Sequence, residues 1–218
     1  MKKHTLLSEI VIFLAIFFLF IVLPLGIQFI NTTATDFSEW SFPLSQMIMS
    51  FICFFLLYFY YEKEKDASPI ILKAFPVIMT FGLLFCVSLL CKALSLLVTE
   101  EDSISALAVK PKSFVQWLFC ILTFLFSAFN EEVIYRFYFS DKLNQLLSLK
   151  IKWPWLWIFC EVIGCALFAF GHFYLGWISV LNAALAHIIL RVSYKKNGRL
   201  WPCVTSHFIY NIISLILL

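Results

Sequence analysis

Long apolar runs, almost free of charged residues, constrain the fold of this sequence more than any other feature. A helix that crosses a membrane needs about 20 consecutive, mostly apolar residues, and seven runs come close to that length. Apolar residues are continuous within the runs and do not alternate with polar ones, so helices are favoured over strands. The sixth run is short, which leaves open a tilted or partly re-entrant helix. The predicted spans are 10–30, 44–61, 74–97, 114–139, 154–173, 175–190 and 200–218.

The composition excludes a soluble protein. Of the 218 residues, 62% are hydrophobic and 13% are charged, whereas soluble domains average about 45–50% apolar and about 25% charged residues. A chain of this size could not bury so much apolar surface in its own core. We therefore predict an all-α, polytopic transmembrane helix bundle of about seven spanning helices, with residues 1–218 forming a single domain in the lipid bilayer.

Cysteine spacing, net charge and the N-terminus argue against a disulfide framework, a cysteine metal site, a nucleic acid partner and a signal peptide. The seven cysteines lie inside apolar runs, without the spacing of a disulfide framework or a metal site. The net charge of +3 gives no reason to expect a nucleic acid partner. The first run, 10–30, is longer than the roughly 7–15 apolar residues of a signal peptide, so we interpret it as a spanning helix.

Basic residues predict the orientation, because cytoplasmic loops are enriched in lysine and arginine. With the N-terminus in the cytoplasm, only Lys92, Lys110 and Lys112 fall on the outer side, and the polar segment 99–112 is a candidate interfacial helix there. Twelve of the sixteen basic residues then fall inside: Lys2, Lys3, Lys63, Lys65, Lys73, Lys142, Lys150, Lys152, Arg191, Lys195, Lys196 and Arg199.

Three ionisable residues interrupt the fourth run, where a charged side chain is costly and indicates a functional site. Glu132 and Arg136 are four residues apart, so they share a helix face and can pair. Glu131 points about 100° away from Glu132 and is free to face something else. A purely structural charge cluster is the alternative, but it explains only the pair and leaves Glu131 without a partner.

The fifth and seventh runs carry polar residues of the same kind. His172 ends the fifth run, and His207 and Asn211 lie four residues apart, on one face of the seventh. Each of them taken alone is explained as a hydrogen bond between helices. Two further polar residues have structural interpretations: Glu161 as a group near the cytoplasmic edge, with a place in the cavity as the alternative, and His187 as a structural histidine.

Taken together, these residues resemble the CPBP family of CAAX-processing and bacteriocin-processing intramembrane peptidases, also called Abi. The resemblance covers residues 113–218. The segment 197–202 is also similar to the family's Gly-x-Leu-Trp-Pro turn. The family pattern is Glu-Glu-x-x-x-Arg, Phe-x-x-x-His and His-x-x-x-Asn, which is found here as Glu131, Glu132 and Arg136, then Phe168 and His172, then His207 and Asn211.

The resemblance implies a catalytic set of Glu131, His172, His207 and Asn211. Burial raises the pKa of a carboxyl group towards neutrality, which suits a general base. The resemblance implies that Glu131 is the base that activates a water. His172 would help to bind that water, and His207 and Asn211 would donate hydrogen bonds to the oxyanion. Glu132 and Arg136 would form a supporting ion pair.

No cofactor is expected to be required. Two histidines and a carboxylate can hold zinc, but the His-Glu-x-x-His helix of soluble zinc peptidases is missing, so we favour a mechanism without a metal. By counting from the ends of the runs, Glu131 and His207 lie at similar depths, while His172 falls nearer the outer face. A tilted fifth helix, or one that begins below the membrane surface, would reconcile them, and we expect a cavity that opens to the cytoplasm.

The implied substrate is a peptide or membrane protein, lipid-modified as in a prenylated CAAX sequence, at a bacterial cytoplasmic membrane. Two other functions compete with this one. A transporter would need a polar path through all the helices, yet the runs 10–30 and 44–61 contain no charged residue. A non-catalytic bacteriocin-immunity or binding protein could use the same fold. Neither the peptide nor the oligomeric state follows from the sequence.

Overall fold

The computed structural model describes residues 5–30, 35–36, 42–60, 70–98 and 108–217. Within them, seven continuous helical segments occupy the seven predicted runs. Four are long and apolar enough to cross a membrane, and the three shorter apolar helices are Leu44–Tyr60, Leu156–Phe170 and Trp201–Leu217. The predicted all-α membrane fold is confirmed. The predicted orientation in the membrane stays a prediction.

Two of the segments are long helices that contain a π-helical stretch. The first segment joins α1 (Leu6–Phe17), η1 (Phe18–Val22) and α2 (Leu23–Ile30). The fourth joins α6 (Phe114–Glu131), η2 (Glu132–Tyr138) and α7 (Phe139–Leu147). The others are α3 (Leu44–Tyr60), α4 (Ile70–Val98), α8 (Leu156–Phe170), α9 (Trp177–Asn197) and α10 (Trp201–Leu217), with a short 3-10 turn η3 (Phe173–Leu175) before α9.

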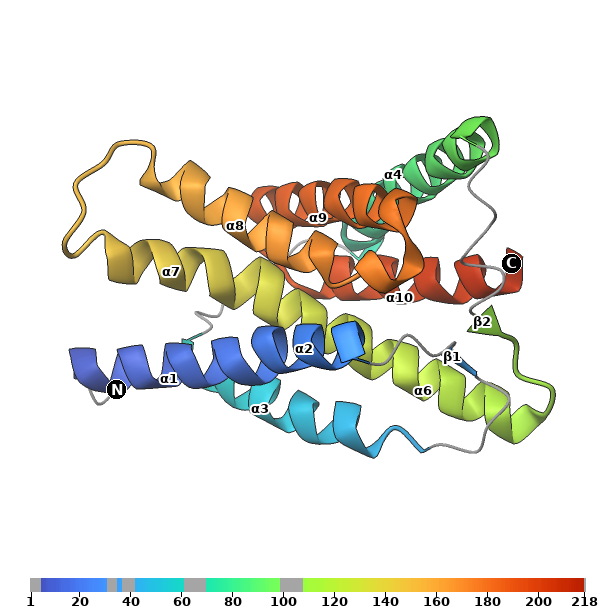
Figure 1. Cartoon of the computed structure of the whole chain (residues 1–218), viewed down its shortest axis with the longest axis horizontal. Coiled ribbons are helices and arrows are strands. Elements are labelled where there is room, and N and C mark those ends of the chain that lie inside the picture. The colour runs from blue at the N-terminus through green and yellow to red at the C-terminus, as the bar shows by residue number, and fades with distance from the viewer. Residues whose placement is uncertain (1–4, 31–34, 37–41, 61–69, 99–107, 218) are drawn as a thin grey trace.

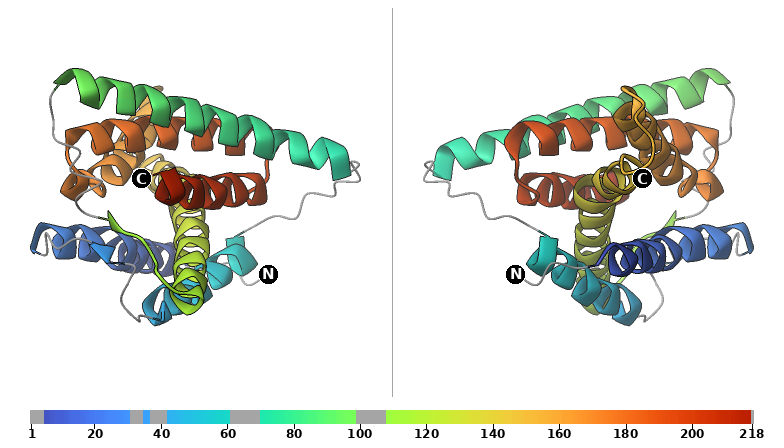
Figure 2. Two further views of the ribbon diagram at one scale, coloured as in Figure 1. Left: turned by 90° about the vertical axis from the view of Figure 1, so that its right-hand side faces the viewer. Right: turned by 90° about the vertical axis from the view of Figure 1, so that its left-hand side faces the viewer.

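Apart from α4, which lies across the others, the helices run back and forth along one long axis, so α1 begins and α10 ends at opposite ends of the bundle (Figure 1). The segment α6–η2–α7 lies in the middle: α3 packs against α6, α1 against α7, and α8 against α7 and α9. Helix α4 crosses the outside of α9 and α10 (Figure 2). Residues of η2, among them Val133 and Ile134, are fully buried in the largest hydrophobic cluster.

In the described residues, strands are limited to one short pairing outside the helices. Strands β1 (Thr35–Asp36) and β2 (Ala108–Val109) lie parallel, with Thr35 opposite Ala108. Part of the candidate interfacial helix at 99–112, residues 99–107, lies outside the described residues. The described part of this segment begins with β2.

Two predicted boundaries are wrong. The fourth span does not end at 139 but continues to Leu147, because Lys142 is buried there, forms an ion pair with Glu9 of α1 and lies 4.8 Å from the ring centre of Tyr60. The sixth helix is not short: α9 runs for 21 residues.

The longer fourth helix removes the disagreement between the predicted membrane depths of Glu131 and His172. Helices α7 and α8 form a hairpin, so positions can be counted from its closed end. Glu131 lies sixteen residues before the end of α7 at Leu147, and His172 lies sixteen residues after the start of α8 at Leu156. At 1.5 Å per residue both are about 24 Å from the turn. The two residues are therefore level.

Candidate active site

The site is built on η2, a π-helical stretch of seven residues in the middle of the long fourth segment. Helix α6 starts with a capping box, in which Ser113 and Gln116 satisfy the first free backbone N–H groups. Short π-helical stretches inside α-helices are frequent at functional sites, and they break the regular α-helical hydrogen bonding. Here the main-chain carbonyl of Arg136 accepts a hydrogen bond from the guanidinium of Arg191 on α9. A neighbouring helix therefore supports the irregular turn.

Glu132 and Arg136, predicted from their spacing to pair, lie in contact with each other. Neither side chain is exposed, and Arg136 Nε lies 3.3 Å from Glu132 Oε2. Arg136 also lies over the ring of Phe168 on α8, 4.2 Å from its centre, and Nη1 lies 3.2 Å from His187 Nδ1 on α9. An arginine on an aromatic face gains a cation–π attraction that is strongest when water is excluded.

His207 lies between the two glutamates. Its Nδ1 is 2.8 Å from Glu132 Oε1, and its Nε2 is 3.8 Å from Glu131 Oε2. An ionised carboxylate only accepts hydrogen bonds, so Nδ1 donates to Glu132. The imidazole is thereby fixed with its second nitrogen directed to Glu131, and α10 is connected to the acidic pair of the fourth segment.

Among the described residues, Glu131 accepts a hydrogen bond through only one of its two carboxylate oxygens. Ser127, one turn earlier on α6, donates a hydrogen bond of 2.7 Å to Glu131 Oε1. Glu131 Oε2 is buried and has no hydrogen-bond partner among the described residues, although the side chain as a whole is 28% exposed. Glu132 Oε2 also has no hydrogen bond among the described residues, but Glu132 is fully buried with that oxygen against Arg136. Of the two acids, Glu131 is therefore the one that a water or a substrate can reach.

His172 lies in the turn after α8, partly buried. Its Nδ1 is 3.0 Å from the main-chain carbonyl oxygen of Phe168, and its ring packs 5.0 Å from the Phe168 ring. A carbonyl only accepts, so Nδ1 carries the proton and Nε2 keeps a lone pair when the ring is neutral. The charges of Glu131, His207 and Arg136 act on this ring, so His172 lies near Glu131.

Asn211 lies one turn after His207 on α10 and is partly buried. Within the part of the chain that the structure describes, its side chain has no hydrogen bond. The neighbouring Tyr210 accepts a hydrogen bond of 2.9 Å from Asn182 on α9. The turn before α10 has the predicted form: Gly198 ends α9 in the left-handed conformation, at φ 64°, and α10 begins at Trp201.

Three further residues support the site without having been singled out for it. Ser127 orients Glu131. Asn130 fastens α6 to α3, because it accepts a hydrogen bond of 2.7 Å from Ser50 and donates one of 3.0 Å to the carbonyl of Gln46. His187, interpreted from the sequence as structural, is 2% exposed and contacts Arg136. Only the polarity of these residues in apolar runs could have pointed to them.

The arrangement does not fit a metal centre well. Among the described residues, no group of three histidine, cysteine or acidic side chains is placed to hold a metal ion. Both ring nitrogens of His207 face carboxylates, and Nδ1 of His172 faces a carbonyl. We therefore derive no chemical step through zinc.

A second ionic cluster lies near the closed end of the α7–α8 hairpin. Arg191 donates hydrogen bonds to Glu161 at 2.6–3.1 Å and to Asp141 at 2.7 Å. Lys195 donates to the same oxygen of Asp141 at 2.7 Å. Glu161 therefore belongs to a polar cluster five residues into α8, and it also lines a groove between α8 and α9.

Comparison with known proteins finds one family. Residues 113–213 match the family model of the Rce1-like type II CAAX prenyl endopeptidases. No curated protein and no solved structure matches the chain. The matched region runs from the start of α6 into α10 and includes each of the six predicted site residues. The resemblance seen in the motifs is thus confirmed, and residues 113–213 of this chain are similar to the Rce1-like type II CAAX prenyl endopeptidases.

Proposed function

We propose that this protein hydrolyses peptide bonds of prenylated or otherwise lipid-modified peptides with a water activated by Glu131. The observation that supports this assignment is the difference between the two adjacent acids. Glu132 is fully buried and enclosed by Arg136 and His207, whereas the Glu131 side chain is 28% exposed and its Oε2 accepts no hydrogen bond among the described residues. A carboxylate in such a position can accept the proton of a water.

In the proposed reaction, Glu131 takes one proton from the water while the remaining hydroxide attacks the peptide carbonyl carbon. The new C–O bond gives a tetrahedral intermediate, whose oxyanion needs hydrogen-bond donors already in place. His207, held through Nδ1 by Glu132, donates from Nε2 when protonated, and the amide of Asn211 donates one turn further along α10. Glu131 then gives its proton to the leaving amine as the C–N bond breaks.

The other members of the set position these groups. His172, with Nδ1 directed to the Phe168 carbonyl, offers Nε2 to the attacking water. Arg136 compensates the charge of Glu132, so that Glu132 remains an acceptor for His207. No metal takes part, and activity is expected to survive prolonged treatment with a strong chelator.

The proposed location is a bacterial cytoplasmic membrane, with the N-terminus in the cytoplasm. Basic side chains at the end of the bundle that holds the α7–α8 and α9–α10 turns support this orientation, because both turns fall on the same side. We infer that Lys150, Lys152, Lys195 and Lys196 face the cytoplasm.

The test uses purified protein in detergent with fluorogenic prenylated CAAX peptides, and mass spectrometry of the products. We expect release of the residues that follow the prenylated cysteine, in the presence or absence of chelator, and no release by Glu131→Gln. The same peptides without the prenyl group are the control for substrate class. Cleavage that stops with chelator and returns with zinc would contradict the metal-free mechanism. Absence of cleavage of every peptide by well-folded wild type would favour a non-catalytic binding protein.

A further inference from the structure

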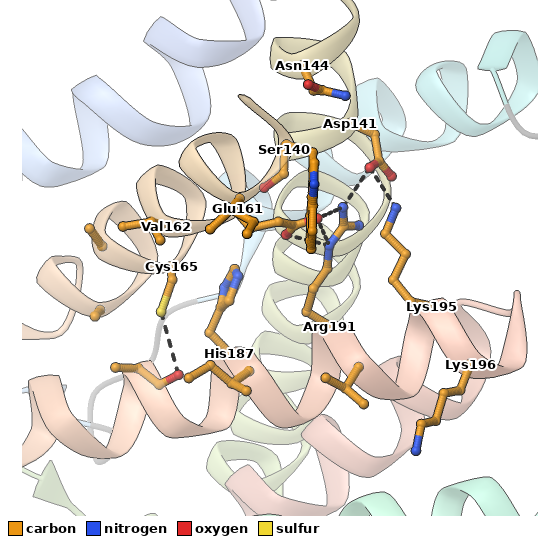
Figure 3. A pocket seen from close by; sticks show the side chains of 17 residues that line it. Ser140, Asp141, Asn144, Glu161, Val162, Cys165, His187, Arg191, Lys195 and Lys196 are labelled. Atoms are coloured by element: carbon orange, nitrogen blue, oxygen red, sulfur yellow. Dashed lines mark hydrogen bonds and ion pairs between the residues drawn. The ribbon is translucent and has the colours of Figure 1, made fainter. Parts of the chain in front are cut away.

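A groove of about 870 Å³ lies between α8 and α9 on the outside of the bundle (Figure 3). Glu131, His172, His207 and Asn211 do not line it, so it is separate from the proposed catalytic set. Its walls are mostly apolar. They include Val162, Ala166 and Ala169 of α8, and Ala184, Ile188 and Val192 of α9.

The groove is directed to the lipid. Val162 is 59% exposed and Ile188 is 50% exposed, which in a bilayer means contact with acyl chains. Trp157, also exposed and lining the groove, lies near the start of α8. Tryptophan is enriched where the membrane core meets the head groups. The end of the groove at Trp157 is therefore expected at head-group level, and the apolar walls extend from there into the membrane.

The charges sit towards one end of the groove. Arg191 lies between Glu161 and Asp141, and Lys195 reaches Asp141 (Figure 3). With Lys196, the lining has three cations against two anions, a net charge of one positive. A ligand with a negative group at this end is favoured over a neutral one.

Two buried polar atoms of the groove lining have no hydrogen-bond partner among the described residues: Ser140 Oγ and His187 Nε2. Their residues are only 1% and 2% exposed. Arginine has no acceptor atom, so His187 Nδ1 must accept from Arg136, and the proton of the neutral ring is on Nε2. The residues that line the groove thus hold an N–H and an O–H without a described acceptor, in apolar surroundings where unpaired polar groups are unfavourable.

We propose that this groove binds a membrane glycerophospholipid with an anionic head group. One acyl chain lies along Val162, Ala166 and Ile188. Ester or phosphate oxygens of the lipid accept hydrogen bonds from His187 and Ser140, and the negative charge lies near Lys195. A neutral hydrocarbon would leave both polar atoms unpaired, and a free anion would leave the apolar walls uncovered, so an amphipathic lipid fits better than either.

This site goes beyond the proposed peptidase function and does not depend on it. The groove is nevertheless connected to the candidate active site, because His187 contacts Arg136, which pairs with Glu132. A lipid that accepts a hydrogen bond from His187 holds the ring in the tautomer that Arg136 requires. Bound lipid is therefore expected to stabilise the buried ion pair.

Native mass spectrometry of the purified protein with phosphatidylglycerol or phosphatidylcholine tests the proposal. Ala166→Trp fills the groove, and Ala93→Trp, at an exposed position of α4 outside the groove, is the matched control. We expect wild type and Ala93→Trp to retain phosphatidylglycerol in preference to phosphatidylcholine, and Ala166→Trp to lose about tenfold or more of that retention, because the added ring occupies the space of the acyl chain. Equal retention by both tryptophan variants would overturn the proposal, as would equal retention of the two lipids by wild type.

Ser140→Ala provides a milder second variant in case the tryptophan disturbs folding. Because Ser140 Oγ has no hydrogen-bond partner among the described residues, its removal breaks no described interaction. Loss of one hydrogen bond to the lipid is expected to weaken binding about fivefold. Unchanged phosphatidylglycerol binding by Ser140→Ala, with unchanged binding by a folded Ala166→Trp, would exclude the groove as the lipid site.

Discussion

Two arginines in this membrane protein each pair with carboxylates, and they do so in opposite ways. Arg191 donates hydrogen bonds from all three of its nitrogens, to Glu161, Asp141 and a main-chain carbonyl. Arg136 makes one hydrogen-bond contact, with His187, while its Nε and Nη2 have no hydrogen bond in the described part of the chain. Its contact with Glu132 is an ion pair without the alignment of a hydrogen bond.

The difference separates a structural cluster from a reactive one. The Arg191 cluster lies near the end of the bundle, where Asp141 is 45% exposed and Glu161 is 27% exposed. The Arg136 cluster is fully buried, and next to it Glu131 keeps an oxygen that accepts no hydrogen bond from the described residues. A satisfied network makes the fold rigid, whereas an incompletely satisfied one keeps polar atoms for another molecule. We infer that Arg191 mainly stabilises the fold and that the Arg136 cluster maintains the site.

The largest effect is expected when Arg136 is replaced. Arg136→Met leaves Glu132 buried without its cation, which should lower the free energy of unfolding by about 3–5 kcal/mol. Thermal unfolding in detergent measures the change. The double variant Glu132→Gln/Arg136→Met removes both charges and should recover part of the loss. A single variant as stable as wild type would show that the buried pair does not compensate Glu132.

The next effect concerns His207. His207→Ala removes a proposed oxyanion donor and the contact between α10 and Glu132, and the peptidase rate should fall by about 10²–10³-fold. The kcat of folded protein on a prenylated peptide is the measurement. His187→Gln is the control histidine variant, and it should retain more activity because its ring contacts Arg136 and neither glutamate. Equal losses in the two variants would contradict the separate role of His207.

A smaller change in stability is expected at the end of the bundle. Arg191→Ala removes charged hydrogen bonds to partly exposed acids, which should cost about 1.5–3 kcal/mol. Activity per folded molecule should fall less than in His207→Ala, because Arg191 contacts the site only through the main-chain carbonyl of Arg136. If thermal unfolding is unchanged while kcat falls sharply, the two clusters have been assigned the wrong way round.

The smallest effect is expected at the rim of the same cluster. Lys195 is 50% exposed and pairs with the exposed Asp141, and pairs of this kind contribute about 0–1 kcal/mol. Lys195→Ala should therefore shift thermal unfolding only slightly, and the shift should shrink as salt is added. A large loss would mean that Lys195, too, stabilises the fold.

Much of this organisation could be predicted, because it depends on local periodicity. The apolar runs predicted the helices, the spacing of four predicted the pair of Glu132 and Arg136, and Gly198 fits the predicted turn before α10. These features follow from hydrophobicity and helix geometry within a single segment.

Features that depend on contacts between segments could not be predicted. The fourth helix continues past 139 because Glu9 and Tyr60, far away in the sequence, accommodate the charge of Lys142. The π-helical stretch has no local sequence signature, and the carbonyl of Arg136 finds its donor on α9. The contact of His187 with Arg136 likewise depends on the packing of α9 against η2.

The most direct test of this account compares two acid-to-amide variants, Glu131→Gln and Glu161→Gln. Both remove one carboxylate from a membrane helix, but only Glu131 is proposed to act on the water. Measuring kcat and thermal unfolding for both, we expect Glu131→Gln to lose about 10²–10⁴-fold in kcat with little change in stability. Glu161→Gln should lose stability and keep its kcat. Substantial hydrolysis by folded Glu131→Gln would contradict the assignment of the base and with it the proposed mechanism.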